Sequence, residues 1–174
     1  MRFTATPLQG GCIVEPESHE DNRGLFARTF CAREFQDQGL IPAFVQCNTS
    51  WNARKGTVRG LHYQLHPSSE VKLVRCTAGA LWDVIVDLRR DSPTYLQHFG
   101  VELTSANRRA LYIPQMFAHG FQTLEDGTEV FYQMSEFYTP ELARGLRYND
   151  PKLGIKWPLA AVCVSEKDKA WGWL

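Results

Sequence analysis

The stretch Arg59-Gly60-Leu61-His62-Tyr63-Gln64 is the part of the sequence on which the interpretation of the fold depends. A turn-forming segment at residues 52–56 precedes it, and the stretch itself is typical of a β-strand. Because side chains alternate between the two faces of a strand, one face is expected to carry Val58, Gly60, His62 and Gln64. The other face is expected to carry Arg59, Leu61 and Tyr63. The glycine would leave room for a ligand beside His62, although a hydrogen-bonded core histidine is the alternative.

Short apolar segments of the kind that form β-strands recur along most of the chain, with turn residues between them. Strands are predicted within residues 1–15 and at residues 25–30, 44–50, 71–76, 80–88, 99–103, 110–113, 117–124 and 128–134. Asp126-Gly127 predicts a hairpin between the last two of these, and the polar residues 16–24 predict a loop. Short helices are predicted at residues 32–38 and 165–170. The pattern indicates one all-β domain over residues 1–174, a sandwich or barrel with short peripheral helices.

The composition is that of an ordinary globular protein and argues against several classes of function. The 174 residues carry a formal net charge of zero, which argues against a broad nucleic-acid-binding surface. No apolar run is long enough to span a bilayer, and the first residues have no signal-peptide core. The five cysteines are scattered without a CxxC pair, which suggests reduced thiols in a cytoplasmic protein. The sequence has neither a P-loop nor a dinucleotide-binding glycine motif.

Four polar residues interrupt otherwise apolar strand faces, namely His62, Lys72, His119 and Tyr132. A polar side chain that faces a core without a partner costs about 1–3 kcal/mol, so one such residue is usually a paired core residue. Four of them on successive strands of a small barrel indicate a shared pocket. A metal site is the rival interpretation, because barrels of this size often bind a metal through several histidines. The sequence has no His-x-His pair, but a three-histidine site stays open.

Several runs in the sequence match a known family. They are Arg59-Gly60-Leu61-His62-Tyr63-Gln64, Val71-Lys72, Tyr112-Ile113-Pro114-Gln115-Met116-Phe117-Ala118-His119-Gly120-Phe121, Tyr138-Thr139-Pro140-Glu141 and Asn149-Asp150-Pro151. Between about Asp21 and Asp168 the chain resembles the dTDP-4-dehydrorhamnose 3,5-epimerase family. The resemblance implies a double-stranded β-helix (a cupin-type jelly roll), a homodimer, and catalysis without a metal or other cofactor. It implies a nucleotide-linked 4-keto-6-deoxyhexose as the substrate, in rhamnose-type deoxysugar biosynthesis.

The catalytic residues that the resemblance implies fit the chemistry of such a sugar. A ketone at C4 makes the protons on C3 and C5 acidic, so epimerisation needs a base on one face of the sugar and an acid on the other. By resemblance His62 is the base, Tyr132 is the acid and Lys72 stabilises the enolate oxygen. Asp168 corresponds to the aspartate that pairs with the histidine and fixes its tautomer. Without the resemblance Asp168 would be taken for an exposed charge in a C-terminal helix.

The resemblance also implies a set of contacts to the nucleoside diphosphate and the sugar. Arg23 and Arg59 correspond to diphosphate contacts, a role that the guanidinium fork suits, and Tyr138 corresponds to an aromatic residue that stacks on the base. The remaining substrate-binding positions are Phe26, Arg28, Gln46, Asn48, His119 and Lys167. Part of the N-terminal third is expected to complete the partner's site in the homodimer, which would also cover a sheet edge.

Two positions depart from the family's pattern at the end that binds the nucleotide. Arg28 and Ala143 stand where the family usually has glutamate. A guanidinium has only donors and cannot accept the N3–H of thymine, whereas cytosine and guanine offer adjacent acceptors. These residues predict cytidine or guanosine diphosphate in place of thymidine diphosphate. The alternative is that Arg28 lies in solvent or contacts phosphate and that Tyr138 stacks on thymine.

Two functions from different classes are consistent with these residues. The first is an epimerase that acts at C3, at C5 or at both carbons, since one base and one acid serve either. The second is a cupin-like binding or metal-dependent protein that kept the barrel and lost this chemistry. The complete set of His62, Lys72, Tyr132 and Asp168 favours the epimerase.

Overall fold

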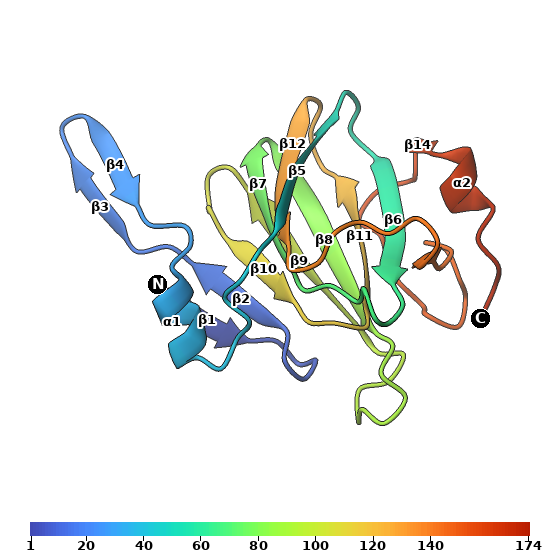
Figure 1. Cartoon of the computed structure of the whole chain (residues 1–174). Coiled ribbons are helices and arrows are strands. Elements are labelled where there is room, and N and C mark those ends of the chain that lie inside the picture. Colours follow the sequence, from blue (N-terminus) through green and yellow to red (C-terminus); the bar gives the residue numbers. More distant parts are fainter.

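The computed structural model describes residues 1–174 and consists mainly of β-strands (Figure 1). Two six-stranded sheets face each other, and a two-stranded hairpin projects from them. The first sheet has the order β1 (Arg2–Ala5), β2 (Cys12–Glu15), β10 (Ala110–Ile113), β7 (Lys72–Ala78), β12 (Thr128–Met134) and β5 (Gln46–Asn52). The second sheet has the order β13 (Ala143–Gly145), β6 (Thr57–Gln64), β11 (Phe117–Thr123), β8 (Ala80–Asp87) and β9 (His98–Thr104), with β14 (Cys163–Val164) parallel to β6.

The main core lies between the two sheets and follows from the alternation of side chains along each strand. Val74 and Cys76 of β7 point inward and meet Leu81 and Ile85 of β8, all of them buried. Leu73, which precedes Val74 on β7, points to the opposite face of the first sheet and belongs to a second apolar cluster. Each large aliphatic side chain that becomes fully buried contributes about 1.5–3 kcal/mol, so this core holds the two sheets together.

The two short helices predicted from the sequence are confirmed. α1 (Ala32–Asp37) buries Phe35 against the outer face of the first sheet, in the same cluster as Leu73 and Tyr112. α2 (Glu166–Lys169) lies beside β6, and its N-cap Ser165 accepts a hydrogen bond from the backbone of Asp168. No helix in the structure has the length and apolar character needed to cross a membrane.

The hairpin predicted at Asp126-Gly127 is wrong, because the strands on either side of this turn belong to different sheets. β11 pairs with β6 and β8, whereas β12 pairs with β5 and β7. The turn is held by the loop before β6, since the backbone of Lys55 donates to Asp126 and the backbone of Gly127 donates to Ala53. The turn residues were recognised correctly, but local turn chemistry does not decide which strand becomes the neighbour.

The prediction that Arg59 shares a face with Leu61 is also wrong. Leu61 packs in an outer apolar cluster, whereas Arg59 lines the inner cavity together with His62. The register between β6 and β11 shifts here, because His119 lies opposite His62 but Phe121 lies opposite Arg59. An irregularity of this kind interrupts the simple alternation of faces.

The glycine at position 60 makes room for a neighbouring strand, and the sequence analysis was wrong to reserve that space for a ligand. A Cβ atom on Gly60 would lie 2.6 Å from both the Cα atom of Gly120 and the carbonyl oxygen of His119. Gly60 also has a φ of +112°, which favours glycine. The close approach of two glycines therefore fixes β6 against β11 and sets the position of His62.

The segment predicted as a loop at residues 16–24 instead contains β3 (Ser18–Asp21), which pairs with β4 (Gly24–Ala27). This hairpin extends away from the two sheets (Figure 1). All four residues of β3 and most of β4 are exposed, including Phe26 at 73%. The polar residues of β3 can form a strand because pairing with β4 requires only hydrogen bonds between backbone groups. Neither face of this hairpin is buried against the rest of the chain, so β3 needs no apolar side chains.

Candidate active site

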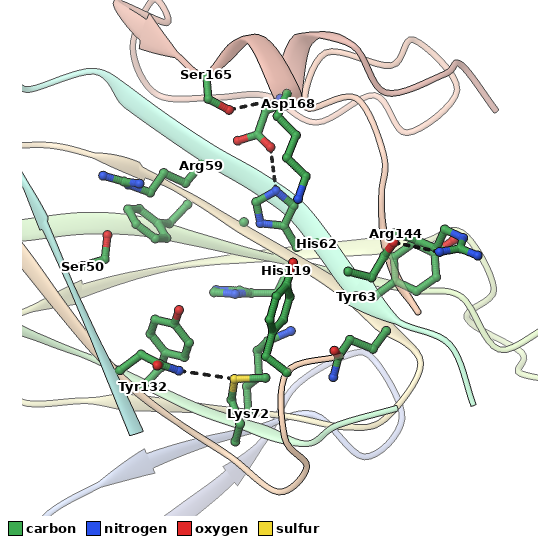
Figure 2. A pocket seen from close by; sticks show the side chains of 18 of the residues that line it. Ser50, Arg59, His62, Tyr63, Lys72, His119, Tyr132, Arg144, Ser165 and Asp168 are labelled. Atoms are coloured by element: carbon green, nitrogen blue, oxygen red, sulfur yellow. Dashed lines mark hydrogen bonds and ion pairs between the residues drawn. The ribbon is translucent and has the colours of Figure 1, made fainter. Parts of the chain in front are cut away.

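A cavity of about 680 Å³ opens between the two sheets. Strands of both sheets and the segment around α2 contribute to its walls (Figure 2). The predicted residues that line it are His62, Lys72, Tyr132, Asp168, Gln46, Asn48, Arg59, His119, Tyr138 and Lys167. A volume of this size falls in the range of small-molecule sites. The structure thus brings together ten of the thirteen positions that the sequence analysis selected.

His62 and Asp168 form a hydrogen-bonded pair in one wall of the cavity. His62 Nε2 lies 2.6 Å from Asp168 Oδ1, and Asp168 Oδ2 accepts a hydrogen bond of 3.2 Å from the backbone of Gly60. The carboxylate is buried, whereas the His62 side chain is 45% exposed toward the cavity. Burial opposes ionisation of Asp168, but the hydrogen bonds from His62 and Gly60 together hold its pKa below the usual value. An ionised Asp168 accepts the Nε2–H of His62 and leaves Nδ1 free to take a proton.

Tyr132 lies on β12, in the sheet opposite to His62, and points into the cavity (Figure 2). Burial raises the pKa of its phenol, and the positive charge of Arg59 opposes this effect. Arg59 itself is held by Asn52, whose Oδ1 accepts from the guanidinium at 2.7 Å. A phenol that stays protonated can donate a proton to a ligand between the two sheets.

Lys72 begins β7 and is buried beside the cavity, where its ammonium group donates to the carboxylate of Glu70. Its neighbours across the sheet are Ile113 of β10 and Met134 of β12. Lys72 comes from the same sheet as Tyr132 and faces the wall that carries His62. A charge-bearing donor in such a partly dry site can stabilise an oxyanion that forms there.

A second histidine–carboxylate pair, which the sequence analysis missed, lies beside the first. His119 Nε2 is 2.5 Å from Asp83 Oδ1, and His119 lies directly opposite His62 in the ladder between β11 and β6. Asp83 is fully buried between Leu81 and Ile85, on the inner face of β8. The signal was present in the sequence, because an aspartate on the core-facing side of an apolar strand needs a partner.

Gln46, Asn48 and Tyr138 line the cavity and are linked by hydrogen bonds. Gln46 donates to Asn48 at 3.2 Å and accepts from the backbone of Tyr138, also at 3.2 Å. The Tyr138 ring is half exposed, so its face is open for stacking.

Other side chains line the cavity but were not predicted from the sequence. They include Ser50, Tyr63, Glu70, Arg144, Cys163 and Trp171.

Arg23, Phe26 and Arg28 were predicted as substrate contacts, but they do not line the cavity of their own chain. All three lie on or next to the projecting β3–β4 hairpin. Arg23 pairs with Asp21, and Arg28 pairs with Glu34 at a distance of 2.9 Å. Within one chain the structure therefore separates these residues from the catalytic candidates.

The structure brings no three His, Cys, Asp or Glu side chains together in an arrangement that could hold a metal ion. His19 and His98 lie on β3 and β9, whereas His62 and His119 each contact a single carboxylate.

Comparison with known proteins assigns the chain to a family. A family model described as dTDP-4-dehydrorhamnose 3,5-epimerase matches residues 5–174. The chain is 46% identical over 174 residues to the dTDP-4-dehydrorhamnose 3,5-epimerase of Methanothermobacter thermautotrophicus, with 98% of this chain and 93% of that one covered.

Two solved structures resemble the fold closely. The dTDP-4-dehydrorhamnose 3,5-epimerase of Bacillus anthracis, solved with TDP and PPi bound, gives a TM-score of 0.96 at 39% identity and covers 99% of both chains. The dTDP-6-deoxy-D-glucose-3,5-epimerase of Legionella pneumophila, in complex with dTDP-4-keto-L-rhamnose, gives 0.91 at 39% identity and covers 98% of this chain and 90% of that one. On this evidence the chain belongs to the dTDP-4-dehydrorhamnose 3,5-epimerase family.

Proposed function

We propose that this chain, an epimerase by its family, inverts C3 and C5 of a dTDP-linked 4-keto-6-deoxyhexose in the biosynthesis of dTDP-rhamnose. The observation that carries the proposal is that the cavity has a histidine–aspartate pair on one sheet and a tyrosine on the other. Inversion at a carbon requires removal of a proton from one side and its return from the other. A sugar ring between His62 and Tyr132 meets this requirement.

The first step of the proposed reaction is removal of a proton next to the C4 ketone. His62 takes the proton on Nδ1, because Nε2 already donates to Asp168. The electron pair of the C–H bond moves into the enolate, and negative charge develops on the C4 oxygen. Asp168 stabilises the imidazolium that forms, and Lys72 supplies a positive charge for the enolate oxygen. Both charged groups are nearly removed from solvent, which strengthens these interactions.

The second step returns a proton to the opposite face of the same carbon. Tyr132 donates its phenolic proton as the enolate collapses to the ketone, and the carbon is inverted. The raised pKa of Tyr132 supports this role, because it keeps the phenol protonated near neutral pH. Proton exchange with solvent then restores His62 and Tyr132, so the cycle consumes no other reactant.

The nucleotide is proposed to occupy the mouth of the cavity. Arg59 and Lys167 would bind the diphosphate, Gln46 and Asn48 would hold the sugar side, and Tyr138 would stack on the base. We propose thymine as the base, because the relatives named above are dTDP-sugar epimerases. The prediction of cytidine or guanosine rested on Arg28, which pairs with Glu34 outside the cavity of its own chain, and on Ala143, which lines the cavity. It stays a prediction that a panel of substrates decides.

We also propose that the two sheets form a double-stranded β-helix and that the chain acts as a homodimer. The outer face of the first sheet supports the second point, because the side chains there include Trp51 at 62% exposure and the exposed Cys47. The same face carries Arg75, whose buried Nε has no hydrogen-bond partner within the chain. In the dimer the β3–β4 hairpin would bring Arg23, Phe26 and Arg28 to the cavity of the partner.

A mixing experiment distinguishes a hairpin that acts on the partner from one that acts on its own chain. Arg23→Ala and His62→Asn are each expected to be strongly impaired as homodimers. After exchange, a heterodimer contains one Arg23→Ala subunit and one His62→Asn subunit. If Arg23 acts across the dimer, the cavity of the first subunit has its own intact His62 and the intact Arg23 of its partner, so this cavity is active. Random exchange should then restore about a quarter of the wild-type activity. The measurement is the epimerisation rate after unfolding and refolding the two variants together.

The matched control is Arg90→Ala mixed with His62→Asn, because Arg90 is exposed between β8 and β9, outside the hairpin and the cavity, and should be active alone. Failure of the Arg23→Ala and His62→Asn mixture to gain activity, with refolding shown by the control, would contradict the exchange of hairpins.

A further inference from the structure

Glu70 is a carboxylate in the wall of the cavity that has no assigned role in the reaction described above. It is 5% exposed and lies two residues before β7. Its Oε1 atom accepts a hydrogen bond from the ammonium group of Lys72, whereas its Oε2 atom is buried without a hydrogen-bond partner in the protein. The Glu70 carboxylate therefore uses only one of its oxygens in a hydrogen bond within the protein, and the donor is Lys72, a proposed catalytic residue.

The backbone on both sides of Glu70 is fixed by hydrogen bonds to other segments. Ser69 accepts from the side chain of Gln115 at 2.8 Å through its carbonyl and from the backbone of Met116 at 2.9 Å through its hydroxyl. Val71 donates from its backbone to the hydroxyl of Ser135 at 2.8 Å and accepts from the backbone of Ser135 at 3.0 Å. The backbone at Glu70 is thus held on both sides by hydrogen bonds to other segments of the chain. A fixed backbone suits a side chain that has to position another side chain.

A purely structural role accounts poorly for this side chain. A buried carboxylate with one unpaired oxygen loses its hydration and recovers only part of that free energy from its partner. An apolar side chain of similar size is commonly as stabilising at such a position. The neighbours of Lys72 across the sheet, Ile113 and Met134, are apolar and offer the ammonium group no charge. The carboxylate is therefore the group that determines where this ammonium lies.

We propose that Glu70 is the positioning residue for Lys72 and that it aims the ammonium group at the C4 oxygen of the sugar. An ammonium group has three donors. One of them is occupied by Glu70, and the rotation of the group is thereby fixed, so the other two are presented to oxygen atoms of the ligand. The inference rests on the proposed function, because it gives Lys72 the role of stabilising the enolate oxygen.

The test is a double-mutant cycle of Glu70→Gln and Lys72→Met in steady-state kinetics with a dTDP-4-keto-6-deoxy sugar. Glutamine has the same shape, but it lacks the charge. Glu70→Gln in the wild-type background should lower kcat by about tenfold or more, with KM and the affinity for dTDP changed by less than about twofold. In the Lys72→Met background the same substitution should change the rate by less than about twofold, since its target is gone. Glu70→Asp, which keeps the charge but is too short to reach Lys72, should lie between Glu70→Gln and the wild type.

Glu102→Gln is the matched control, because Glu102 is exposed on β9 and away from the cavity, and its rate should equal that of the wild type. Equal losses from Glu70→Gln with and without Lys72, or a loss of dTDP affinity that parallels the loss of rate, would show a structural role and overturn the inference. So would a Glu70→Gln variant with wild-type kcat. An inactive wild type would overturn the proposed function and this inference with it, and the two failures are distinguished by that measurement.

Discussion

His62→Asn should abolish the exchange of solvent deuterium into the sugar at every carbon and should lower the rate of epimerisation by about 10²–10⁴-fold. The reason is that both inversions begin with removal of a proton by the same imidazole, which the structure places at the open cavity with Nε2 bound to Asp168. Asparagine can fill part of the space, but it cannot take up a proton near neutral pH. The measurement is mass spectrometry of the sugar nucleotide after incubation in heavy water.

The control for this experiment is His98→Asn, because His98 is exposed at the start of β9 and outside the cavity. It should exchange deuterium at the wild-type rate. If His62→Asn retained exchange close to that of the wild type, another group would be the base. His119 would be the first to examine, since it lies opposite His62 and carries its own carboxylate.

Tyr132→Phe should separate exchange from inversion. Proton removal by His62 is intact in this variant, so deuterium still enters the sugar through return of the proton to the original face. Delivery to the opposite face lacks its donor, and inversion should fall by about 10²–10⁴-fold. The two quantities are measured together, deuterium content by mass spectrometry and configuration by proton NMR of the same sample.

Tyr95→Phe is the matched control, because Tyr95 is exposed and outside the cavity. It should leave both quantities unchanged. A Tyr132→Phe enzyme that inverts the sugar at the wild-type rate would show that the proton arrives from elsewhere. A variant that loses exchange and inversion in equal proportion would show that Tyr132 acts before the enolate forms.

The secondary structure and much of the site followed from the sequence. Strands β10 and β12 have the predicted bounds, and helices α1 and α2 lie within the segments predicted as helical, residues 32–38 and 165–170. The four polar residues on apolar faces, His62, Lys72, His119 and Tyr132, do line one cavity. The prediction succeeded because the side chains of a strand alternate between two faces, and apolar neighbours mark the face that points to the interior. A polar residue on that face therefore points to the interior as well.

The errors have a common cause, which is that sheet partners and backbone irregularities are set by contacts distant in the sequence. Asp126-Gly127 makes a turn, but the turn joins two sheets. The face of Arg59 depends on the shifted register at Gly60, which follows from the approach of Gly120. The exposed strand β3 consists of polar residues and has no apolar alternation to reveal it.

The carboxylates Glu70 and Asp83 were missed for a different reason. Each is buried and pairs with one group, Glu70 with Lys72 two residues along the chain and Asp83 with His119 on the neighbouring strand. A single sequence shows the charged residue but not its partner, and an unpaired carboxylate is usually exposed. Asp168 was assigned only through the resemblance to the family, and its pairing with His62 is the contact that supports that assignment.

The most direct measurement is incubation of the wild-type protein in heavy water with 4-keto-6-deoxyhexoses linked to dTDP, CDP and GDP. The account gives one deuterium at each of C3 and C5 of the dTDP-linked sugar, with both carbons inverted. It predicts much slower incorporation of deuterium into the CDP- and GDP-linked sugars. The order of the three incorporation rates identifies the nucleotide base that the protein prefers. Absence of deuterium from the dTDP-linked sugar, with a folded protein that still binds dTDP, would contradict the account.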